Sequence, residues 1–319
     1  MASQSTQFGV ELVTFFHPSF WDVPDGAGIM ELGRRDPRAF WEKLLDAVAA
    51  AGVTDLELTF APTDYTTAIA AFGSTAGFAG ALSARGLRVH SHFLASLAHA
   101  SDPSDGAVQR SILADARSQA EFLTEIGGEF LVMGLPSRRT TGSVPTSFVD
   151  LATAGPIADL VNLIGAETVQ HGVTTLLHTE SHSMLWTPRD VDLFMLLTDP
   201  MYVGLCPDAG HLALGGCNPV DVLQRHRGRV RLAHWKDASG PVPAGMTIDE
   251  TIYQRQGAYF RSPGHGVVDW AAWSRELASS GYEGPVLLEI DAAERPVEVL
   301  SAAREFLTGR LLGLASGDR

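Results

Sequence analysis

The chain has 319 residues, of which 45% are hydrophobic, and its 37 acidic and 23 basic side chains give a formal net charge of −14. This composition excludes an intrinsically disordered chain, and the surplus negative charge argues against nucleic acid or an anionic membrane as a partner, because both present phosphate groups. No apolar run approaches the ~18 residues of a membrane helix, and the first residues lack the basic and apolar blocks of a secretory signal, so we expect a soluble, cytoplasmic protein.

Short β-rich runs alternate with amphipathic stretches along the chain. Each run is apolar and rich in Val, Leu or Phe, as is typical of a strand buried on both faces. The predicted strands cover residues 8–14, 55–60, 87–92, 130–134, 173–179, 202–206, 230–234 and 286–290. Some stretches between them start with a capping residue followed by a proline, which is a helix start signal. The clearest of these starts are Asp36-Pro37, Thr187-Pro188 and Asn218-Pro219.

Eight strand–helix units in a chain of this length predict a single-domain α/β fold, the (β/α)8 or TIM barrel, over residues 1–319. The alternative is a doubly wound open sheet. It would need a Gly-rich phosphate-binding turn after its first strand, where the sequence reads Phe15-Phe16-His17-Pro18. The longest irregular segment, at about 238–266, lies between the seventh and eighth strands and exceeds the usual loop length. We expect this insertion to be a lid or a partner surface, and the protein to form a homo-oligomer or to bind a small second subunit.

The polar residues that end the predicted strands are the strongest signal for function, because barrel enzymes place catalytic groups at the C-terminal ends of strands. Glu180, Asp208, His234 and Glu289 follow four consecutive strands. One such residue alone is more often a hydrogen-bonded rim residue, but four charged groups near a core are costly unless they are paired or bind a metal. Three carboxylates and one imidazole suit Mn²⁺, Mg²⁺ or Co²⁺ with positions left open for substrate oxygens.

At these strand ends the sequence resembles the xylose-isomerase-like barrel superfamily of sugar isomerases, epimerases and dehydratases. The motifs that carry the resemblance are Glu180, Asp208-x-x-His211, His234-x-Lys236-Asp237, the turn at 264–269 and Glu289-x-Asp291. The resemblance covers nearly the whole chain. It implies that Glu180, Asp208, His234 and Glu289 bind one divalent ion, often manganese, which holds two neighbouring sugar oxygens. It also implies that His211 contacts the substrate or supports a metal ligand.

Details of the motifs distinguish the branches of this superfamily. Lys236-Asp237 and Glu289-Ile290-Asp291 are closer to inosose dehydratases than to ketose 3-epimerases, which usually have an acidic residue and an arginine after the strand-seven histidine. Inosose dehydratases, however, usually carry a histidine cluster on strand five. Glu180 followed by His182 is instead similar to the catalytic subunits of bacterial C-glycoside deglycosidases, in which His182 would be the base. Endonuclease IV shares the barrel and the Asp-x-x-His motif, but it needs further metals with extra histidines.

The shared chemistry predicts an enzyme that removes a proton next to a carbonyl group of a sugar, cyclitol or oxo-glycoside, while the metal stabilises the enolate as a Lewis acid. A base with a pKa near neutral suits this step, which favours His182, and Lys236 would supply positive charge to the oxyanion. Glu180 and Glu289 complete the predicted catalytic set. We expect β-elimination, as in a dehydratase or a C-glycoside deglycosidase. The alternatives are isomerisation or epimerisation at the same metal site, and a non-catalytic carbohydrate-binding subunit.

Several other polar residues are predicted to bind substrate, and some of them have a structural alternative. Glu57 either hydrogen-bonds a hydroxyl group or braces a neighbouring strand, and His92 either lines the pocket or is a satisfied rim group. His17, which lies among aromatic residues, either faces a sugar or belongs to the core. The full predicted set of substrate contacts is His211, His92, Glu57, Asp237, Arg261, Asp291 and His17.

Overall fold

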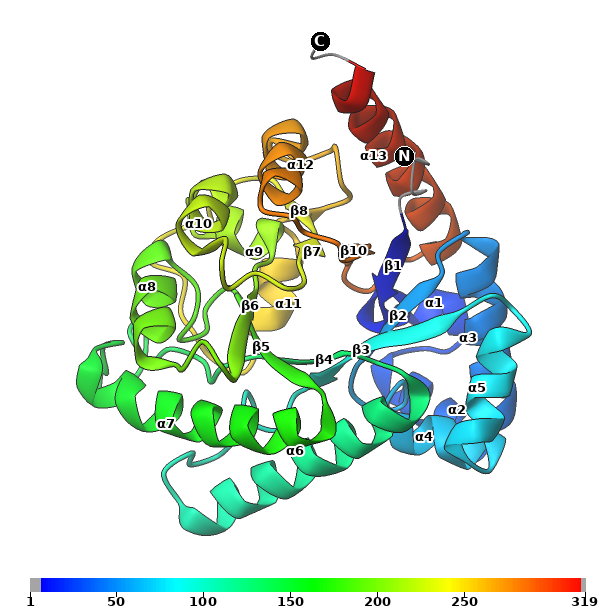
Figure 1. Cartoon of the computed structure of the whole chain (residues 1–319), viewed down its shortest axis with the longest axis horizontal. Helices are drawn as coiled ribbons and strands as arrows, with labels where there is room; N and C mark the ends of the chain where they lie inside the picture. Colours follow the sequence, from blue (N-terminus) through cyan, green and yellow to red (C-terminus); the bar gives the residue numbers. More distant parts are fainter. Residues whose placement is uncertain (1–6, 317–319) are drawn as a thin grey trace.

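The computed structural model describes residues 7–316 and contains an eight-stranded parallel sheet in the order β6-β5-β4-β3-β2-β1-β10-β7. The strands are β1 Phe8–Glu11, β2 Asp55–Leu58, β3 Arg88–Leu94, β4 Phe130–Met133, β5 Thr174–His178, β6 Val203–Cys206, β7 His234–Trp235 and β10 Val286–Leu288. Parallel bridges from Leu205 to Val230 and from Asp208 to His234 join the two ends of this order and close the barrel. The predicted (β/α)8 barrel is confirmed, and Figure 1 shows the helices around the ring of strands.

Helices lie between the strands along the chain, and most of them cover the outside of the barrel (Figure 1). They are α1 Pro18–Trp21, α2 Gly26–Arg35, α3 Pro37–Ala50, α4 Tyr65–Phe72, α5 Thr75–Ser83, α6 Gly106–Ile126, α7 Leu151–Thr168, α8 Pro188–Leu197, α9 Ala209–Leu214, α10 Pro219–His226, α11 Ile252–Gly257, α12 Trp270–Ser279 and α13 Pro296–Ser316, with 3-10 turns η1 Leu12–Phe15 and η2 Val169–His171. The predicted start signals lie where expected. Asp36, for example, accepts a hydrogen bond from the backbone N–H of Ala39 (3.0 Å), and Pro37 is the first residue of α3.

The hydrophobic core has two parts because side chains alternate between the two faces of each strand. The larger part fills the space between the strands and the helices. A small separate cluster consists of Val132, Leu176, Cys206, Leu232 and Leu287, which are all fully buried. Since these residues come from strands on several sides of the ring, the small cluster is the packed interior of the barrel.

The segment between β7 and α12 contains the predicted insertion. Its two ends form an antiparallel ribbon of β8 Asp237–Ala238 and β9 Phe260–Arg261, and α11 lies between them in the sequence. Backbone hydrogen bonds from Val242 N to Leu214 O (2.9 Å) and from Ile248 N to Thr141 O (3.2 Å) attach the insertion to neighbouring loops. The insertion therefore packs against the same end of the barrel as the loops that follow β4 and β6.

Asp237 organises the glycine turn that follows the ribbon. Its fully buried carboxylate accepts hydrogen bonds from the backbone N–H groups of Gly264, Gly266 and Val268 and from Trp270 Nε1, at distances of 2.9 to 3.2 Å. A Cβ atom at Gly266 would lie 2.1 Å from Asp237 Oδ1, so only glycine allows this approach. The prediction that Asp237 contacts substrate is therefore wrong, because its oxygens are occupied by the turn.

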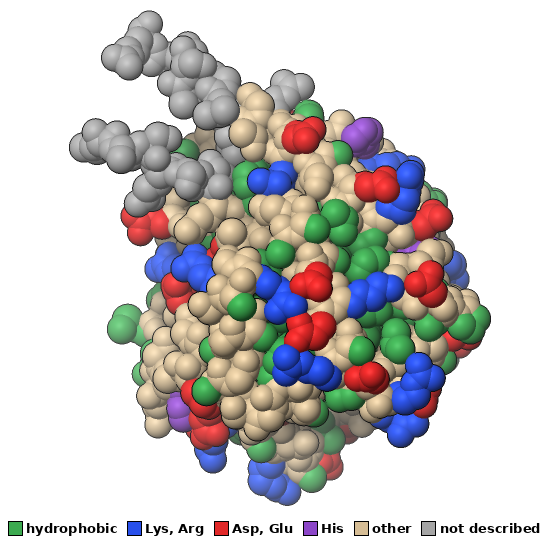
Figure 2. Space-filling model, turned by 90° about the vertical axis from the view of Figure 1, so that its right-hand side faces the viewer, with side chains coloured by type: hydrophobic (Ala, Val, Ile, Leu, Met, Phe, Trp, Pro, Cys, Tyr) green, Lys and Arg blue, Asp and Glu red, His purple; other side chains and the backbone are tan. Residues whose placement is uncertain are grey.

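The surface seen in Figure 2 mixes acidic, basic and hydrophobic side chains, and on this face the Lys and Arg side chains alternate with Asp and Glu. Among residues 7–316, no helix combines the length and the apolar character required to cross a membrane.

Candidate active site

A cavity of about 310 Å³ lies at the C-terminal ends of the barrel strands, where the sequence predicts the site. Its wall includes Tyr253 and Gln256 from α11, which reach the cavity from the insertion. The ionisable residues of the barrel loops and strands that line it are Glu11, His99, His178, Glu180, His211, His234, Lys236, Glu289 and Asp291. The cavity therefore combines a small volume with an unusual density of charge.

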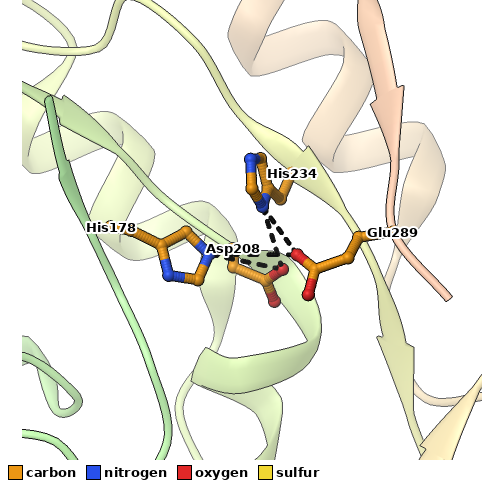
Figure 3. Close-up of side chains that lie close together, drawn as sticks. All are labelled: His178, Asp208, His234 and Glu289. Carbon is orange, nitrogen blue, oxygen red and sulfur yellow. Dashed lines mark hydrogen bonds and ion pairs between the residues drawn. The ribbon is translucent and has the colours of Figure 1, made fainter. Parts of the chain in front are cut away.

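Four side chains at the base of this cavity converge on one point (Figure 3): His178, Asp208, His234 and Glu289. One possible ligand atom from each residue lies within 4.8 Å of the others. His178 Nε2 lies 3.9 Å from Asp208 Oδ2 and 4.0 Å from Glu289 Oε2, while His234 Nδ1 lies 4.0 Å from Asp208 Oδ2 and 2.6 Å from Glu289 Oε2. All four residues are buried.

The alternation of side chains along the strands explains why these four residues meet. Each follows an apolar residue of the barrel interior by two positions: Leu176 precedes His178, Cys206 precedes Asp208, Leu232 precedes His234 and Leu287 precedes Glu289. Side chains two residues apart on a strand point to the same face. The four polar groups thus form the next layer above the packed interior.

The donor set fits a divalent metal ion. Asp208 Oδ2 and His178 Nε2 are buried and have no hydrogen-bond partner among the described residues. Such orphaned atoms cost free energy unless a partner satisfies them. Two imidazole nitrogens and two carboxylate oxygens are ligands for Mn²⁺, Co²⁺ or Zn²⁺. An ion at the point of convergence would satisfy both atoms.

Electrostatics lead to the same conclusion. Burial raises the pKa of Asp208 to about 7, and burial together with the charge of His234 lowers the pKa of His178 to about 3. A metal site needs an ionised carboxylate and neutral imidazole as ligands. The neutral state of His178 already meets that need, and a cation would stabilise the ionised state of Asp208.

The carboxylate of Glu57 lies behind His234. Its Oε1 atom is 3.1 Å from His234 Nε2, the ring nitrogen that does not face the cluster, and its Oε2 atom accepts a hydrogen bond from Ser91 Oγ (2.6 Å). Glu57 is fully buried and does not line the cavity. Of the two predicted roles, the structure favours the structural one: Glu57 braces Ser91 on the neighbouring strand, and its carboxylate lies next to the His234 imidazole.

Lys236 is the charged neighbour of the cluster. Its buried ammonium donates to Glu289 Oε1 (2.5 Å), to Asp291 Oδ1 (2.8 Å) and to His211 Nε2 (3.0 Å). Burial by itself would lower the pKa of Lys236, but the charges of Asp291, Glu289 and Asp208 outweigh burial and raise this pKa. Lys236 is therefore a permanent cation at the cavity wall.

A chain of polar contacts connects Lys236 to the insertion. His211 Nδ1 lies 2.8 Å from Ser181 Oγ, and Ser181 Oγ donates to Gln256 Oε1 (2.6 Å). Ser181, His211 and Gln256 are each at most 3% exposed. His211 lines the cavity, and its backbone N–H donates to Asp208 Oδ1 (2.7 Å), but whether it contacts the substrate or supports a metal ligand stays a prediction.

The loop after β5 differs from the prediction for two residues. Glu180 was expected to be the fourth metal ligand, but the structure places His178 in that position and puts the Glu180 carboxylate elsewhere on the cavity wall. His182 was expected to be the base, but it does not line this cavity and faces a different one. The reason is a tight turn, in which Ser183 N donates to Glu180 O (3.2 Å) and His182 takes a left-handed backbone conformation (φ 66°).

Glu180 remains at the site in another position. Its carboxylate makes no hydrogen bond or ion pair with the part of the chain that the structure describes, although it lines the cavity. Burial raises the pKa of Glu180 to about 8. This carboxylate is thus free to exchange a proton with a bound molecule.

Three other predicted substrate contacts lie away from the cavity. His17 accepts a hydrogen bond from Ser19 N (3.2 Å) and caps α1. His92 is buried below the surface, and the guanidinium of Arg261 donates to backbone carbonyls of its own loop. Only Asp291 joins His211 among the predicted substrate contacts that line the cavity.

Several cavity residues were missed by sequence reasoning, among them His178, Glu11, Tyr253 and Gln256. His178 carries a signal, because it is the polar residue that directly ends a strand. Glu11 also carries one, as an acidic residue inside the first apolar run. Tyr253 and Gln256 carry none beyond the length of the insertion, because only the docking of α11 brings them to the cavity.

Comparisons with known proteins place this geometry in context. The model of the Xylose isomerase-like TIM barrel family matches residues 45–309. The inosose dehydratase of Geobacillus thermodenitrificans is 26% identical over 202 residues, which cover 60% of this chain and 68% of the relative. The IOLI protein, solved with a bound zinc atom, has a TM-score of 0.70 at 14% identity and covers 97% of this chain and 99% of its own. The apo form of 3-keto-D-glucoside 4-epimerase YcjR from E. coli has a TM-score of 0.66 at 16% identity, with 96% and 100% covered.

Proposed function

The chain belongs to the xylose isomerase-like TIM-barrel family, and we propose that it is a divalent-metal-dependent enzyme that removes the proton next to a carbonyl group of a sugar, cyclitol or oxo-glycoside. Relatives named as inosose dehydratases support a sugar or cyclitol substrate. The epimerase named for a 3-keto-glucoside shares the fold. Both names denote a substrate in which a keto group lies beside hydroxylated carbons.

The observation that carries the proposal is the buried cluster of His178, Asp208, His234 and Glu289 with its orphaned atoms. Binding alone does not require four converging polar groups in a protein interior, since their desolvation is costly. This argues against a non-catalytic carbohydrate-binding subunit. With two imidazoles in the set, we favour Mn²⁺ and keep Co²⁺ and Zn²⁺ as alternatives.

The ion would act as a Lewis acid that stabilises negative charge on the substrate oxygens. The side chains around it have separate roles. Lys236 holds Glu289 in place and adds positive charge beside the developing oxyanion. Glu180, which has no partner of its own in the described chain, would accept the proton from the carbon next to the carbonyl group in its ionised form, which the charge of Lys236 and of a bound ion would favour against burial. This role replaces the one predicted for His182.

A second acid–base group faces Glu180 across the cavity. Glu11 ends β1, and Glu180 follows β5, so that three strands separate them on either side of the ring. Burial, reinforced by the charges of Glu289 and Glu57, raises the pKa of Glu11 well above its usual value. A protonated carboxyl group on this wall is suited to donate a proton to a leaving hydroxyl or alkoxyl group. We therefore favour β-elimination.

Epimerisation is the second candidate, and the same geometry supports it. If the carbon that loses its proton to Glu180 receives one from Glu11 on the opposite face, its configuration inverts. The two reactions differ in product, because elimination creates an enone that absorbs ultraviolet light and epimerisation does not.

The test uses an inosose and a 3-oxo-glucoside in deuterium oxide with the Mn²⁺-loaded protein, followed by NMR for exchange next to the carbonyl and by ultraviolet absorbance. We expect exchange in the wild type and its loss in Glu180→Gln and in Glu289→Gln. The exposed Glu298→Gln is the matched control and keeps full activity. Undiminished exchange in both cavity variants would exclude the proposed site.

A further inference from the structure

A second cavity of about 320 Å³ lies beside the metal-site cavity and shares no lining residue with it. The loops after β4, β5 and β6 form its floor, and residues 241–248 of the insertion form its roof. Its polar and aromatic lining residues are Arg138, Thr140, Thr141, His182 and Trp186. This volume is within the range of small-molecule sites.

His182, which has no role in the proposed reaction, lines this cavity in an energetically unfavourable conformation. Its left-handed backbone (φ 66°) is uncommon for a residue with a side chain, and Arg138 N holds it by donating to its carbonyl oxygen (2.8 Å). The imidazole is 3% exposed and packs against Trp186, with ring centroids 4.4 Å apart. Its Nε2 atom has no hydrogen-bond partner among residues 7–316. Strain and an unpartnered buried atom on one residue are typical of a functional position.

Arg138 provides positive charge next to His182. Its Nη1 atom donates to Asp190 Oδ2 (3.1 Å), while Nε is buried and has no partner in the described chain. Asp190 is shared with Arg189, whose Nη1 lies 3.6 Å from Oδ1. Arg189 is largely exposed and does not line the cavity, so Arg138, with its unpartnered Nε, is the cationic side chain that the cavity offers. Burial, together with the smaller effect of the positive charges of Arg138 and Arg255, lowers the pKa of His182 to about 4, so that its ring is neutral at neutral pH.

The remaining walls are apolar. The roof contributes Pro241, Val242, Pro243 and Met246, and the floor contributes Leu214. The indole of Trp186 forms an aromatic wall, and its Nε1 donates to His211 O (2.8 Å), which fixes the ring. Flat apolar walls favour a planar ring, and a guanidinium with a free donor favours a carboxylate.

We propose that this cavity is a second binding site, distinct from the metal cluster, for a small aromatic carboxylate whose ring lies against Trp186 and whose carboxylate pairs with Arg138. His182 is the neutral hydrogen-bonding partner of the same ligand. The inference does not depend on the proposed reaction, because the ligand need not be the substrate.

The test titrates the metal-loaded protein with benzoate, and with benzyl alcohol as the neutral analogue, by ligand-observed NMR. We expect benzoate to bind and Arg138→Ala to weaken binding about tenfold or more, because a charge-assisted hydrogen bond is lost. Arg139→Ala, which removes the exposed neighbouring arginine, is the matched control and leaves binding unchanged.

Two further variants keep the result decisive. Ala244 lies at the exposed edge of the roof, so Ala244→Trp fills the cavity without removing any polar contact and should abolish binding in a protein that still folds. Glu289→Gln changes the metal cluster and its contact with Lys236, neither of which lines the second cavity, and it should leave the benzoate signal in place. Absence of benzoate binding, equal binding of benzyl alcohol, insensitivity to both Arg138→Ala and Ala244→Trp, or loss of binding in Glu289→Gln would each overturn the proposal.

Discussion

At the scale of single residues, the site depends on one buried cation among several carboxylates. Lys236 is 1% exposed and contacts both Glu289 and Asp291. A buried charge is tolerable only while its partners remain, because each ion was removed from water at a cost of several kcal/mol. Lys236 therefore contributes to folding as well as to the field that the substrate experiences.

Removing this cation should destabilise the protein. In Lys236→Met the two carboxylates lose their counter-charge, and we expect the free energy of unfolding to fall by about 3 kcal/mol, together with loss of exchange activity. Denaturant unfolding at pH 7 measures the first effect. Lys43→Met is the control, since Lys43 is 42% exposed and lies 3.5 Å from Asp22, and it should change stability by less than ~1 kcal/mol. Similar losses in both variants would contradict the account.

Because His92 is buried in its neutral form, we expect the free energy of unfolding to depend on pH. Its Nε2 atom accepts from Tyr65 N (3.4 Å), so the ring must be neutral there, and burial lowers its pKa to about 4. The unfolded chain has the ordinary pKa of ~6.5 and binds more protons between pH 6.5 and 4, so stability falls as the pH falls through this window. In His92→Gln the free energy of unfolding should fall by up to about 3 kcal/mol less between pH 6.5 and pH 4 than in the wild type. Denaturant unfolding at each pH measures this difference. The exposed His265→Gln should keep the wild-type slope; a slope unchanged in His92→Gln would refute this assignment.

At the scale of elements, the strands were predictable and the loops only in part. Buried runs of Val, Leu and Phe mark strands wherever they occur, and residues two positions after an inward-facing apolar side chain meet above the barrel interior. By this spacing His178, which follows Leu176, is expected in the cluster. Glu180 comes two residues after His178 and lies in the turn that follows β5. Three of the four converging residues, Asp208, His234 and Glu289, were expected at this position from the sequence, because each follows an inward-facing apolar residue by two positions. The turn that redirects Glu180 and His182 has no local signal as strong as a strand.

The insertion shows the same limit. Its length predicted a lid or a partner surface, but the contact of Gln256 with Ser181 joins segments far apart in the sequence. Only the folded chain reveals which face of α11 meets the cavity. The expectation of a homo-oligomer or a second subunit stays a prediction.

The turn held by Asp237 provides a test at this scale. Gly266→Ala would place a methyl group against Asp237 Oδ1 and Ala238 O, so we expect the free energy of unfolding to fall by about 1–3 kcal/mol from overpacking. Gly245→Ala is the matched control, because nothing lies within 4 Å of a Cβ atom at this position of the same insertion. Thermal unfolding compares the two variants. Equal melting temperatures for the two variants would show that the turn accommodates the added methyl group without loss of stability.

At the scale of the whole molecule, the barrel combines a packed interior with a polar layer directly above it. The same alternation of side chains produces both, so the fold positions the four converging side chains without any specialised loop. The cavity beside it depends on loops and on the insertion. This division explains why the family and three residues of the converging cluster could be predicted from the sequence, while the second cavity could not.

The proposed metal site can be tested by measuring the metal content of the purified protein by plasma mass spectrometry, after dialysis against Mn²⁺ and then buffer. We expect about one divalent ion per chain in the wild type, loss of the ion in His178→Ala and Glu289→Gln, and its retention in Glu180→Gln. A wild type without metal would show that the four side chains do not form a metal site. So would a protein that keeps the ion in His178→Ala and loses it in Glu180→Gln.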